Sequence, residues 1–195
     1  VPPVSPRVRR PRGRRGARGS HTLTGNVTPH RGVAGLALGR PRDLLVYLPP
    51  GYGEGERRYP VVYAQDGQNL FDAATAFGGQ EWELDETTEL LVRAGAIPPV
   101  IVVGIPNAGL RRIDEYAPTR DARRRAGGQA EAYGHLLLHE VKPFVDRTFR
   151  TEPEPHGVCL LGSSMGALVS LFLALRYPHA IGAAVVMSPS VWWDR

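Results

Sequence analysis

One serine between two glycines is the residue of this sequence best suited to chemistry. The run Gly162-Ser163-Ser164-Met165-Gly166 has the spacing G-x-S-x-G, which is typical of a sharp turn from a strand into a helix. Such a turn exposes the central hydroxyl, and the first amides of the helix point toward the same place, where they can stabilise an oxyanion. The pattern favours Ser164 as an acyl-transfer nucleophile, although a Gly/Ser-rich turn that only begins a helix has the same letters.

The segments on both sides of this turn have the patterns that the motif requires. The apolar run 157–161 predicts a strand before it, and the apolar run 167–175 predicts a helix after it that ends before Pro178. That helix is apolar almost all round, so we expect it to be buried against a sheet. This context favours the nucleophile over the simple helix start.

Strand-like and helix-like segments alternate along the rest of the chain. We expect an irregular edge strand within 21–42, strands at 43–48, 60–64, 100–105 and 181–187, and helices at 83–94 and, in two pieces divided near Pro143, at 129–149. The alternation predicts an α/β fold with a mostly parallel sheet and helices on both faces. Functional loops of such sheets lie at the carboxyl ends of the strands, so the loops 65–80, 106–125 and 162–166 are expected to form one cleft.

Positive charge is concentrated at the start of the chain. Of the 24 Lys and Arg residues, seven arginines lie in residues 1–20 beside no acidic residue, and the remaining 17 are outnumbered by 19 Asp and Glu. We expect residues 1–20 to be a disordered Arg/Pro-rich tail and residues 21–195 to be part of a single domain. A nucleic-acid-binding tail is the alternative and predicts salt-dependent DNA affinity. It has no aromatic residue to stack on a base, so no nucleic-acid partner is expected.

The cysteine count and hydropathy indicate a cytoplasmic protein. The single cysteine, Cys159, allows no intramolecular disulfide and lies within an expected strand, where a small apolar core residue is the plainer interpretation than a nucleophile. No apolar run approaches membrane-spanning length, and the first residues lack the apolar segment of a secretory signal. No membrane partner is therefore expected.

Two groups of residues resemble metal sites only weakly. His135 and His139 are spaced i, i+4 and precede Glu140, but a third ligand is not evident, so surface histidines are the more economical interpretation. The loop 66–72 contains acids and amides without the twelve-residue calcium pattern. We expect Asp66 to bond backbone groups of its own loop, and we expect no metal and no organic cofactor.

A charged cluster occupies the loop 106–125. It consists of Arg111, Arg112, Asp114 and Glu115. These side chains could clamp a polar or anionic substrate, or they could pair with one another in solvent. The sequence leaves both interpretations open.

Four stretches together resemble a known family. They are Asp66-Gly67-Gln68-Asn69-Leu70-Phe71-Asp72, Arg112-Ile113-Asp114-Glu115-Tyr116, Gly162-Ser163-Ser164-Met165-Gly166 and Ser188-Pro189-Ser190-Val191-Trp192-Trp193. In this order they resemble the putative-esterase branch of the α/β-hydrolases, over roughly residues 21–195. That branch includes enterochelin-type siderophore esterases, S-formylglutathione hydrolases of the esterase D type, feruloyl and acetylxylan esterases and mycolyltransferases. The most similar members are bacterial enterochelin-esterase-like proteins.

The resemblance implies the α/β-hydrolase fold and a set of site residues. Ser164 is implied as the nucleophile. The backbone N–H groups of Met165 and Gln68 are implied as the oxyanion hole, with Gly67 providing clearance for the backbone. Asp66, Trp82 and Tyr116 are expected to line the cleft and contact substrate.

The sequence departs from the family in lacking a base and an acid after the serine. In this fold the order is Ser, Asp/Glu, His, but His179 follows the far end of the exit helix, roughly 20 Å away at about 1.5 Å per residue. Asp194 follows a strand, yet the family's acid lies further on. We therefore expect the acid, the histidine and the last strands to lie beyond Arg195. This chain alone is expected to be inactive and poorly folded, with Trp192 and Trp193 uncovered and its last strand an open edge.

These observations predict a serine hydrolase that cleaves carboxylic esters through a Ser-His-Asp/Glu triad. The partner would be a small-molecule ester: a carbohydrate ester, a siderophore lactone or a thioester. The alternative is a non-catalytic binding protein with the hydrolase fold, because a fold does not fix a function.

Overall fold

The computed structural model describes residues 21–193. The expected tail at 1–20 and the candidate Asp194 lie outside the described residues. Within the described part, every helix is too short or too polar to cross a bilayer.

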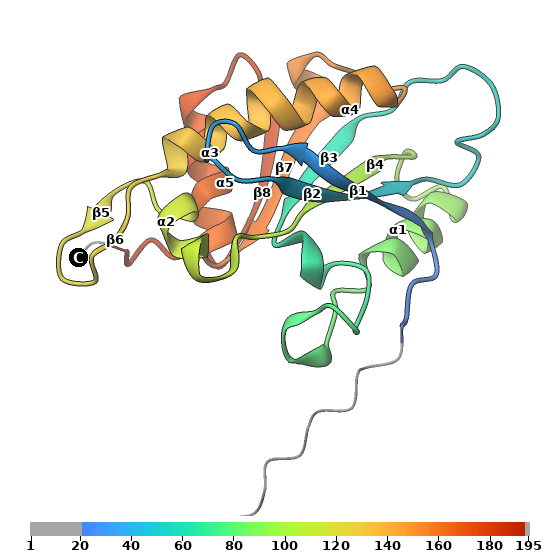
Figure 1. Cartoon of the computed structure of the whole chain (residues 1–195). Helices are drawn as coiled ribbons and strands as arrows, with labels where there is room; N and C mark the ends of the chain where they lie inside the picture. Colours follow the sequence, from blue (N-terminus) through green and yellow to red (C-terminus); the bar gives the residue numbers. More distant parts are fainter. Residues whose placement is uncertain (1–20, 194–195) are drawn as a thin grey trace, which may run out of the picture.

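A six-stranded mixed sheet forms the centre of the fold (Figure 1). Its order is β1-β2-β4-β3-β7-β8, with β4, β3, β7 and β8 parallel and with β1 and β2 antiparallel to their neighbours. The strands are β1 Asn26–Ala34, β2 Arg42–Leu48, β3 Val61–Gln65, β4 Ile101–Ile105, β7 Val158–Ser163 and β8 Ala183–Met187. The expected edge strand is β1, and the predicted α/β architecture with a mostly parallel sheet is confirmed.

Apolar clusters cover both faces of the sheet. One cluster joins the strands to the helices α3 Ala130–Leu136, α4 Lys142–Thr148 and α5 Met165–Arg176. The opposite face packs against α1 Leu84–Arg93 and the loop that precedes it. Strand β4 is buried at every position, as its continuous β-branched run predicts for a strand covered on two faces. Six of the twelve residues of α5 are buried as well, although Leu175 is exposed.

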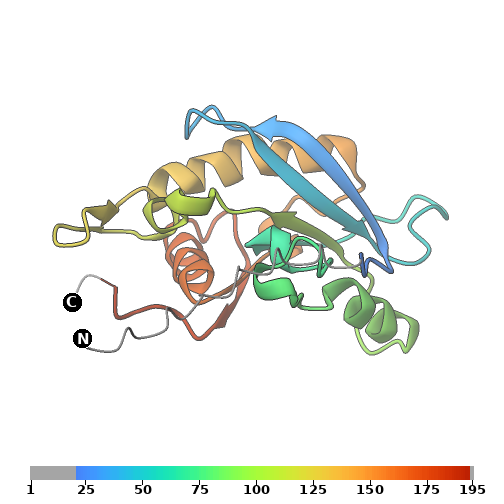
Figure 2. The same cartoon turned by 60° about the horizontal axis from the view of Figure 1, so that its bottom comes forward.

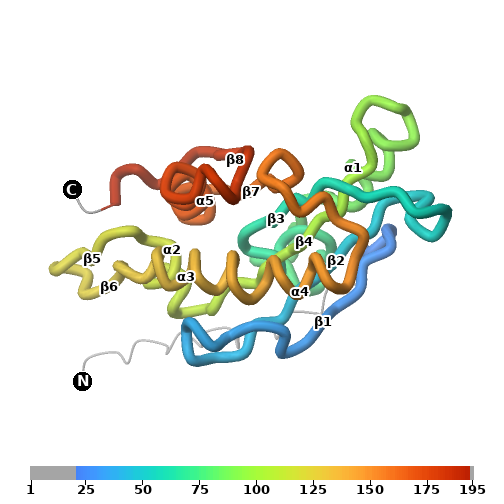
Figure 3. The backbone as a smooth tube through the Cα atoms, turned by 90° about the horizontal axis from the view of Figure 1, so that it is seen from above, coloured from blue at the N-terminus to red at the C-terminus, as the bar shows by residue number. Residues whose placement is uncertain are grey.

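The helical segment 130–148 is one continuous element rather than two pieces (Figure 3). A π-helical stretch, η4 Leu137–Val141, joins α3 to α4. Pro143 lies inside this continuous segment, directly after the π-helical stretch, whose wider turn accommodates the proline ring and the missing N–H. The expected division near Pro143 is therefore wrong, because the irregularity precedes the proline and is absorbed by a wider turn.

Several short elements lie in the connections. They are η1 Gly67–Asn69, η2 Phe77–Gly79, η3 Gly109–Arg111, α2 Arg112–Tyr116, β5 Arg120–Asp121, β6 Ala126–Gly127 and η5 Pro155–Gly157. The segment 106–125, expected as a polar loop, thus contains a helix and one strand of a hairpin. The polar composition of this segment predicts a solvent-exposed loop, whereas α2 buries the polar residue Glu115 together with Tyr116.

Strand β8 is the last strand of the described sheet and exposes apolar side chains. Val185 and Met187 are exposed on it, and Trp192 beyond it is 53% exposed, as expected for an open edge. Trp193 is only 8% exposed, so the expectation that it is uncovered is wrong. Its indole N–H donates to the Thr119 carbonyl oxygen (2.9 Å), because the segment after β8 runs beside the β5–β6 hairpin (Figure 2).

A buried ion pair fastens the start of β2 to α2. The Arg42 guanidinium donates from Nη2 to both carboxylate oxygens of Glu115 (2.9 and 2.8 Å) and from Nη1 to the Pro106 carbonyl oxygen (3.1 Å). The two side chains are 4% and 2% exposed. Burial makes the pair sensitive to the loss of either partner.

A second carboxylate fastens the turn after β1 to η4. Glu140 accepts hydrogen bonds from the N–H groups of Gly35 (2.6 Å), Leu36 (2.9 Å) and Ala37 (2.7 Å). Partial burial raises the pKa of Glu140, but the three amide bonds outweigh burial and lower it below its ordinary value of 4.5. The charged form therefore stabilises the folded state.

The Arg42→Met substitution is expected to destabilise the complete protein by about 3–5 kcal/mol, because it leaves the Glu115 carboxylate buried and unpaired. Urea unfolding measures the loss. The control is Arg93→Met, which breaks the exposed Arg93–Glu89 pair and should cost only about 0.3–0.5 kcal/mol. Equal losses in the two variants would contradict this role of Arg42.

The Glu140→Gln substitution is expected to destabilise the protein at pH 7 and to do so less as the pH falls. The folded pKa of Glu140 is below the unfolded value, so its contribution is present above about pH 5 and is lost as pH falls through the folded pKa. Urea unfolding of both proteins between pH 7 and pH 3 tests this. The exposed Glu154→Gln control should show a difference that does not change with pH, and a pH-independent difference for Glu140→Gln would refute the assignment.

Candidate active site

Ser164 occupies a sharp turn between β7 and α5, as the sequence predicts. Its backbone has φ 57° and ψ −119°, a conformation that is strained for any residue with a side chain. The strand and helix approach each other closely here: a Cβ on Gly162 would lie 2.2 Å from the Gly166 carbonyl oxygen. Ser164 itself is exposed, so the turn presents its hydroxyl to solvent.

The last residue of β8 and the segment after this strand hold the Ser164 peptide on both sides. The Ser164 N–H donates to the Met187 carbonyl oxygen (3.0 Å), and the Ser190 N–H donates to the Ser164 carbonyl oxygen (3.1 Å). The Ser190 and Ser164 hydroxyl oxygens lie 3.0 Å apart. The sequence gives no sign of this contact, because nothing in the stretch 188–193 separates Ser190 from other loop serines.

The loop after β3 is organised around the buried carboxylate of Asp66. The Arg112 guanidinium donates to it from Nε (2.6 Å to Oδ1) and Nη2 (2.7 Å to Oδ2), and the Asn107 side-chain amide donates to Oδ1 (2.6 Å). Asp66 has a left-handed backbone with φ 57°. The expectation that Asp66 bonds backbone groups of its own loop is wrong, because Asn107 and Arg112 reach it from the loop after β4.

This loop meets the turn at Ser164. A Cβ on Gly166 would lie 3.1 Å from Asp66 Oδ2, so only glycine lets the first turn of α5 come this close. Gly67 has no room for a side chain either: a Cβ there would lie 2.5 Å from the Ile105 nitrogen. The absence of a side chain at Gly67 therefore lets the backbone of β4 lie directly against this loop.

The two amides implied as an oxyanion hole lie in the first turns of two helical elements. Met165 is the first residue of α5, and Gln68 is the second residue of η1; the first amides of a helix have no acceptor within it. Among residues 21–193 neither N–H donates a backbone hydrogen bond. The Gln68 side chain accepts the Asn107 N–H (3.1 Å), which fixes this loop further. Asn107 is the second residue after β4, and the rule of strand carboxyl ends could have identified it.

Two of the residues expected to line the cleft are engaged elsewhere. Tyr116 has no exposed surface, so its expected place on the cleft wall is wrong: its hydroxyl accepts the Asp66 N–H (3.3 Å), and burial raises its pKa. Trp82 packs with the apolar cluster between the sheet and α1. Substrate contact by Trp82 and by the nearly buried Asp66 stays a prediction.

The charged cluster of the 106–125 segment neither forms an open clamp nor pairs with itself. Arg112 binds Asp66, and this hydrogen bond raises the pKa of the guanidinium. Glu115 pairs with Arg42, and Asp114 accepts the Gly127 N–H (2.8 Å). These side chains therefore join separate elements of the fold, which the local sequence could not reveal.

The histidines of the chain lie in surroundings that do not include Ser164. His21 contacts Asp72, His30 packs on Phe144 and Phe149, His135 packs on His139, His179 packs on Tyr177, and His156 lies in η5 before the amino end of β7. Both His135 and His139 are exposed, and Glu140 is occupied by amides. The described residues thus form no base beside Ser164.

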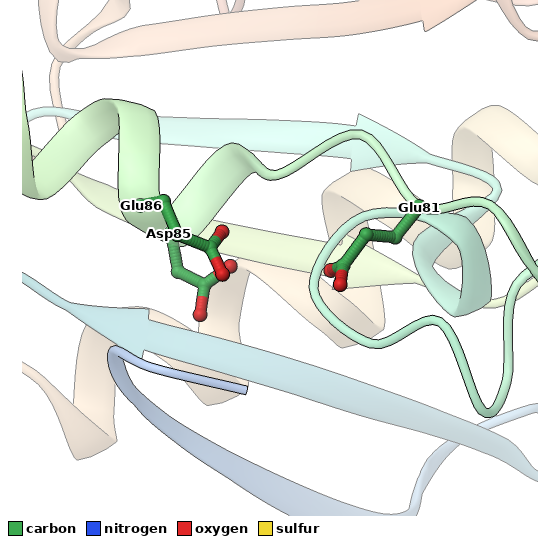
Figure 4. Close-up of side chains that lie close together, drawn as sticks. All are labelled: Glu81, Asp85 and Glu86. Carbon is green, nitrogen blue, oxygen red and sulfur yellow. The ribbon is translucent and has the colours of Figure 1, made fainter. Parts of the chain in front are cut away.

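Three carboxylates that the sequence analysis did not consider lie close together near α1. Oxygens of Glu81, Asp85 and Glu86 are all within 4.8 Å of one another (Figure 4). Asp85 accepts the N–H groups of Thr24 (3.1 Å) and Gly25 (2.9 Å). Burial, and then the neighbouring Asp85, raise the pKa of Glu86 above its ordinary value. The cluster joins the start of the described chain to α1, away from Ser164.

Strained backbone marks the carboxyl ends of three strands. Positive φ angles at non-glycine residues occur at Asp66 after β3, Ser164 after β7 and Ser188 after β8, and these strands are neighbours in the sheet. Such strain persists only where the surrounding structure holds it. A cleft of about 610 Å³ lies elsewhere, between the turn after β1 and η4–α4, and has no part in this arrangement.

Comparison with known proteins identifies relatives of this chain. Residues 35–195 match the family described as "Putative esterase". The Bacillus subtilis protein YjcH, itself uncharacterized, is 32% identical over 155 residues, covering 79% of this chain and 58% of YjcH. The B. subtilis ferri-bacillibactin esterase BesA is 25% identical over 152 residues, covering 70% of this chain and 50% of BesA.

Solved structures share the fold. An IroE-like serine hydrolase from Shewanella oneidensis superposes with a TM-score of 0.71 at 23% identity, covering 87% of this chain and 52% of that one. The chain spans about half the length of the curated relatives it matches.

The Arg112→Met substitution is expected to destabilise the complete protein by about 1–3 kcal/mol, because the Asp66 carboxylate loses its charged partner while it stays buried. Urea unfolding measures the loss. The neighbouring Arg111 is exposed, and Arg111→Met should change the free energy of unfolding by less than about 0.5 kcal/mol. If the two variants are equally stable, the Asp66–Arg112 pair does not hold these loops together.

Proposed function

The chain belongs to the Putative esterase family, and from this membership we propose that the complete protein is a serine hydrolase of carboxylic esters with Ser164 as its nucleophile. The observation that carries the proposal is the strained, exposed Ser164 at the start of α5, beside the Asp66 loop. A hydroxyl in that position reaches a bound ester without displacing protein atoms.

Ser164 would attack the ester carbonyl carbon through its Oγ. Its proton passes to a base as the carbon–oxygen bond forms, and the base then protonates the leaving alcohol. Water attacks the resulting acyl-serine by the same steps in reverse order and releases the acid. The exposed position of Ser164 gives both the ester and the water access to this atom.

The N–H groups of Met165 and Gln68 would bind the oxygen that becomes negative during attack. Support comes from their place at the beginnings of α5 and η1 and from the absence of an acceptor for either among the described residues. Donors that are already fixed need no reorganisation as charge develops, which is why such sites lower the barrier. The Arg112–Asp66 pair would keep the Gln68 amide in place.

The proposal assigns the base and its acid to residues outside this sequence. Support comes from the histidines of the chain, each of which lies in surroundings away from Ser164, and from relatives of which the matched part covers only 58% and 50%. The acid would orient the histidine and stabilise its charged form. The described residues contribute the nucleophile and the oxyanion donors.

The substrate class is a small-molecule carboxylic ester. BesA is named as an esterase of ferri-bacillibactin, which makes siderophore esters the first compounds to test, beside carbohydrate esters and thioesters. The proposed chemistry requires only an accessible carbonyl and a leaving group that can accept a proton.

The Ser164→Ala substitution in the complete protein is expected to lower hydrolysis of p-nitrophenyl esters by roughly 10⁶-fold, since the nucleophile is lost. A fluorophosphonate should label the wild-type protein on the peptide that contains residue 164, as mass spectrometry can show. Ser163→Ala removes the neighbouring hydroxyl and should remain labelled.

A wild-type protein that binds an ester without hydrolysing it, and that the fluorophosphonate leaves unmodified, would contradict the proposal. That result would favour the alternative, a non-catalytic protein with the hydrolase fold. Labelling of Ser163 in place of Ser164 would also overturn the assignment.

A further inference from the structure

The contact between Ser190 and Ser164 suggests a function for a second serine. We propose that Ser190 is a positioning residue that donates its hydroxyl hydrogen to Ser164 Oγ and so holds the nucleophile in its reactive orientation. This inference rests on the proposed function of Ser164. Its basis is the 3.0 Å distance between the two hydroxyl oxygens, with Ser164 exposed and Ser190 only 2% exposed.

Ser190 is itself held firmly, which a positioning residue requires. Its N–H donates to the Ser164 carbonyl oxygen (3.1 Å), and its own carbonyl oxygen accepts the Trp193 N–H (3.1 Å). The Trp193 indole is anchored in turn to Thr119 across the hairpin. The backbone that carries the Ser190 hydroxyl is therefore fixed in position. Among the described residues, the side-chain partner of this hydroxyl is Ser164.

The direction of the hydrogen bond follows from what the reaction needs. Ser164 must keep its own proton free for the base, so its oxygen accepts from Ser190 and does not donate to it. An oxygen on a freely rotating exposed side chain would spend time in other rotamers. During attack one lone pair of Ser164 Oγ forms the bond to the carbonyl carbon while its proton passes to the base, and the hydrogen bond from Ser190 occupies the other lone pair and so fixes the direction of attack. The effect therefore falls on the rate of attack and not on substrate binding.

The Ser190→Ala substitution in the complete protein tests this. A net contribution of one neutral hydrogen bond corresponds to roughly a tenfold effect. We expect kcat to fall about tenfold per reactive site with KM changed less than about twofold, and phosphonylation of Ser164 by a fluorophosphonate to slow by a similar factor. Titration of reactive sites removes any contribution from misfolded protein.

The matched control is Ser170→Ala, which removes another buried serine hydroxyl close by in α5. The Ser170 Oγ has no hydrogen-bond partner among the described residues, so kcat and the phosphonylation rate should stay at wild-type values. A slower phosphonylation of Ser190→Ala beside an unchanged control supports the proposal.

Three results would overturn it. Phosphonylation and kcat per site that match the wild type would show that Ser190 is dispensable. A rise in KM with unchanged kcat would mean that Ser190 binds substrate instead. A wild-type protein that is inert toward both ester and fluorophosphonate would refute the proposed function and this inference together, whereas a reactive wild type with an equally reactive Ser190→Ala refutes only the inference.

Discussion

The site depends on one constraint: β7 and α5 come so close that the residue between them cannot adopt an ordinary backbone conformation. Gly162 allows this approach because it has no Cβ to collide with the Gly166 backbone, and Gly166 in turn lets α5 lie against Gln65 and Asp66. Ser164 adopts the strained conformation, which costs on the order of 1–3 kcal/mol. Its backbone hydrogen bonds with Met187 at the end of β8 and with Ser190 beyond it hold the residue there. Exposure of the hydroxyl and the direction of the Met165 amide are both consequences of this turn.

The sheet brings the other parts to the same edge. Strands β3, β7 and β8 are neighbours and run parallel, so the loops that follow them meet although they are far apart in sequence. The Asp66 carboxylate joins the loop after β3 to the loop after β4 through Asn107 and Arg112, and it lies against the first turn of α5. The parallel sheet brings the loops close together, and the buried Asp66–Arg112 pair holds the loops after β3 and β4 in place.

The sequence predicts the backbone of this arrangement well and its side-chain partners poorly. Apolar runs and the G-x-S-x-G spacing are local signals, and they located the strands, α5 and the exposed Ser164 correctly. The role of Tyr116 and the pairing of Asp66 were wrong because they depend on residues about fifty positions apart. The break predicted near Pro143 is absent, because the wider π-helical turn before the proline accommodates its ring and its missing N–H. Ser190 gave no signal, since its importance comes from a single tertiary contact.

The most direct test of the central claim is a crystal structure of the complete protein after reaction with a fluorophosphonate. The adduct imitates the tetrahedral centre formed when a serine attacks an ester. We expect phosphorus bonded to Ser164 Oγ and its non-ester oxygen within about 2.7–3.1 Å of the Met165 and Gln68 nitrogens. An adduct on another residue, or an oxygen turned away from both amides, would contradict the account.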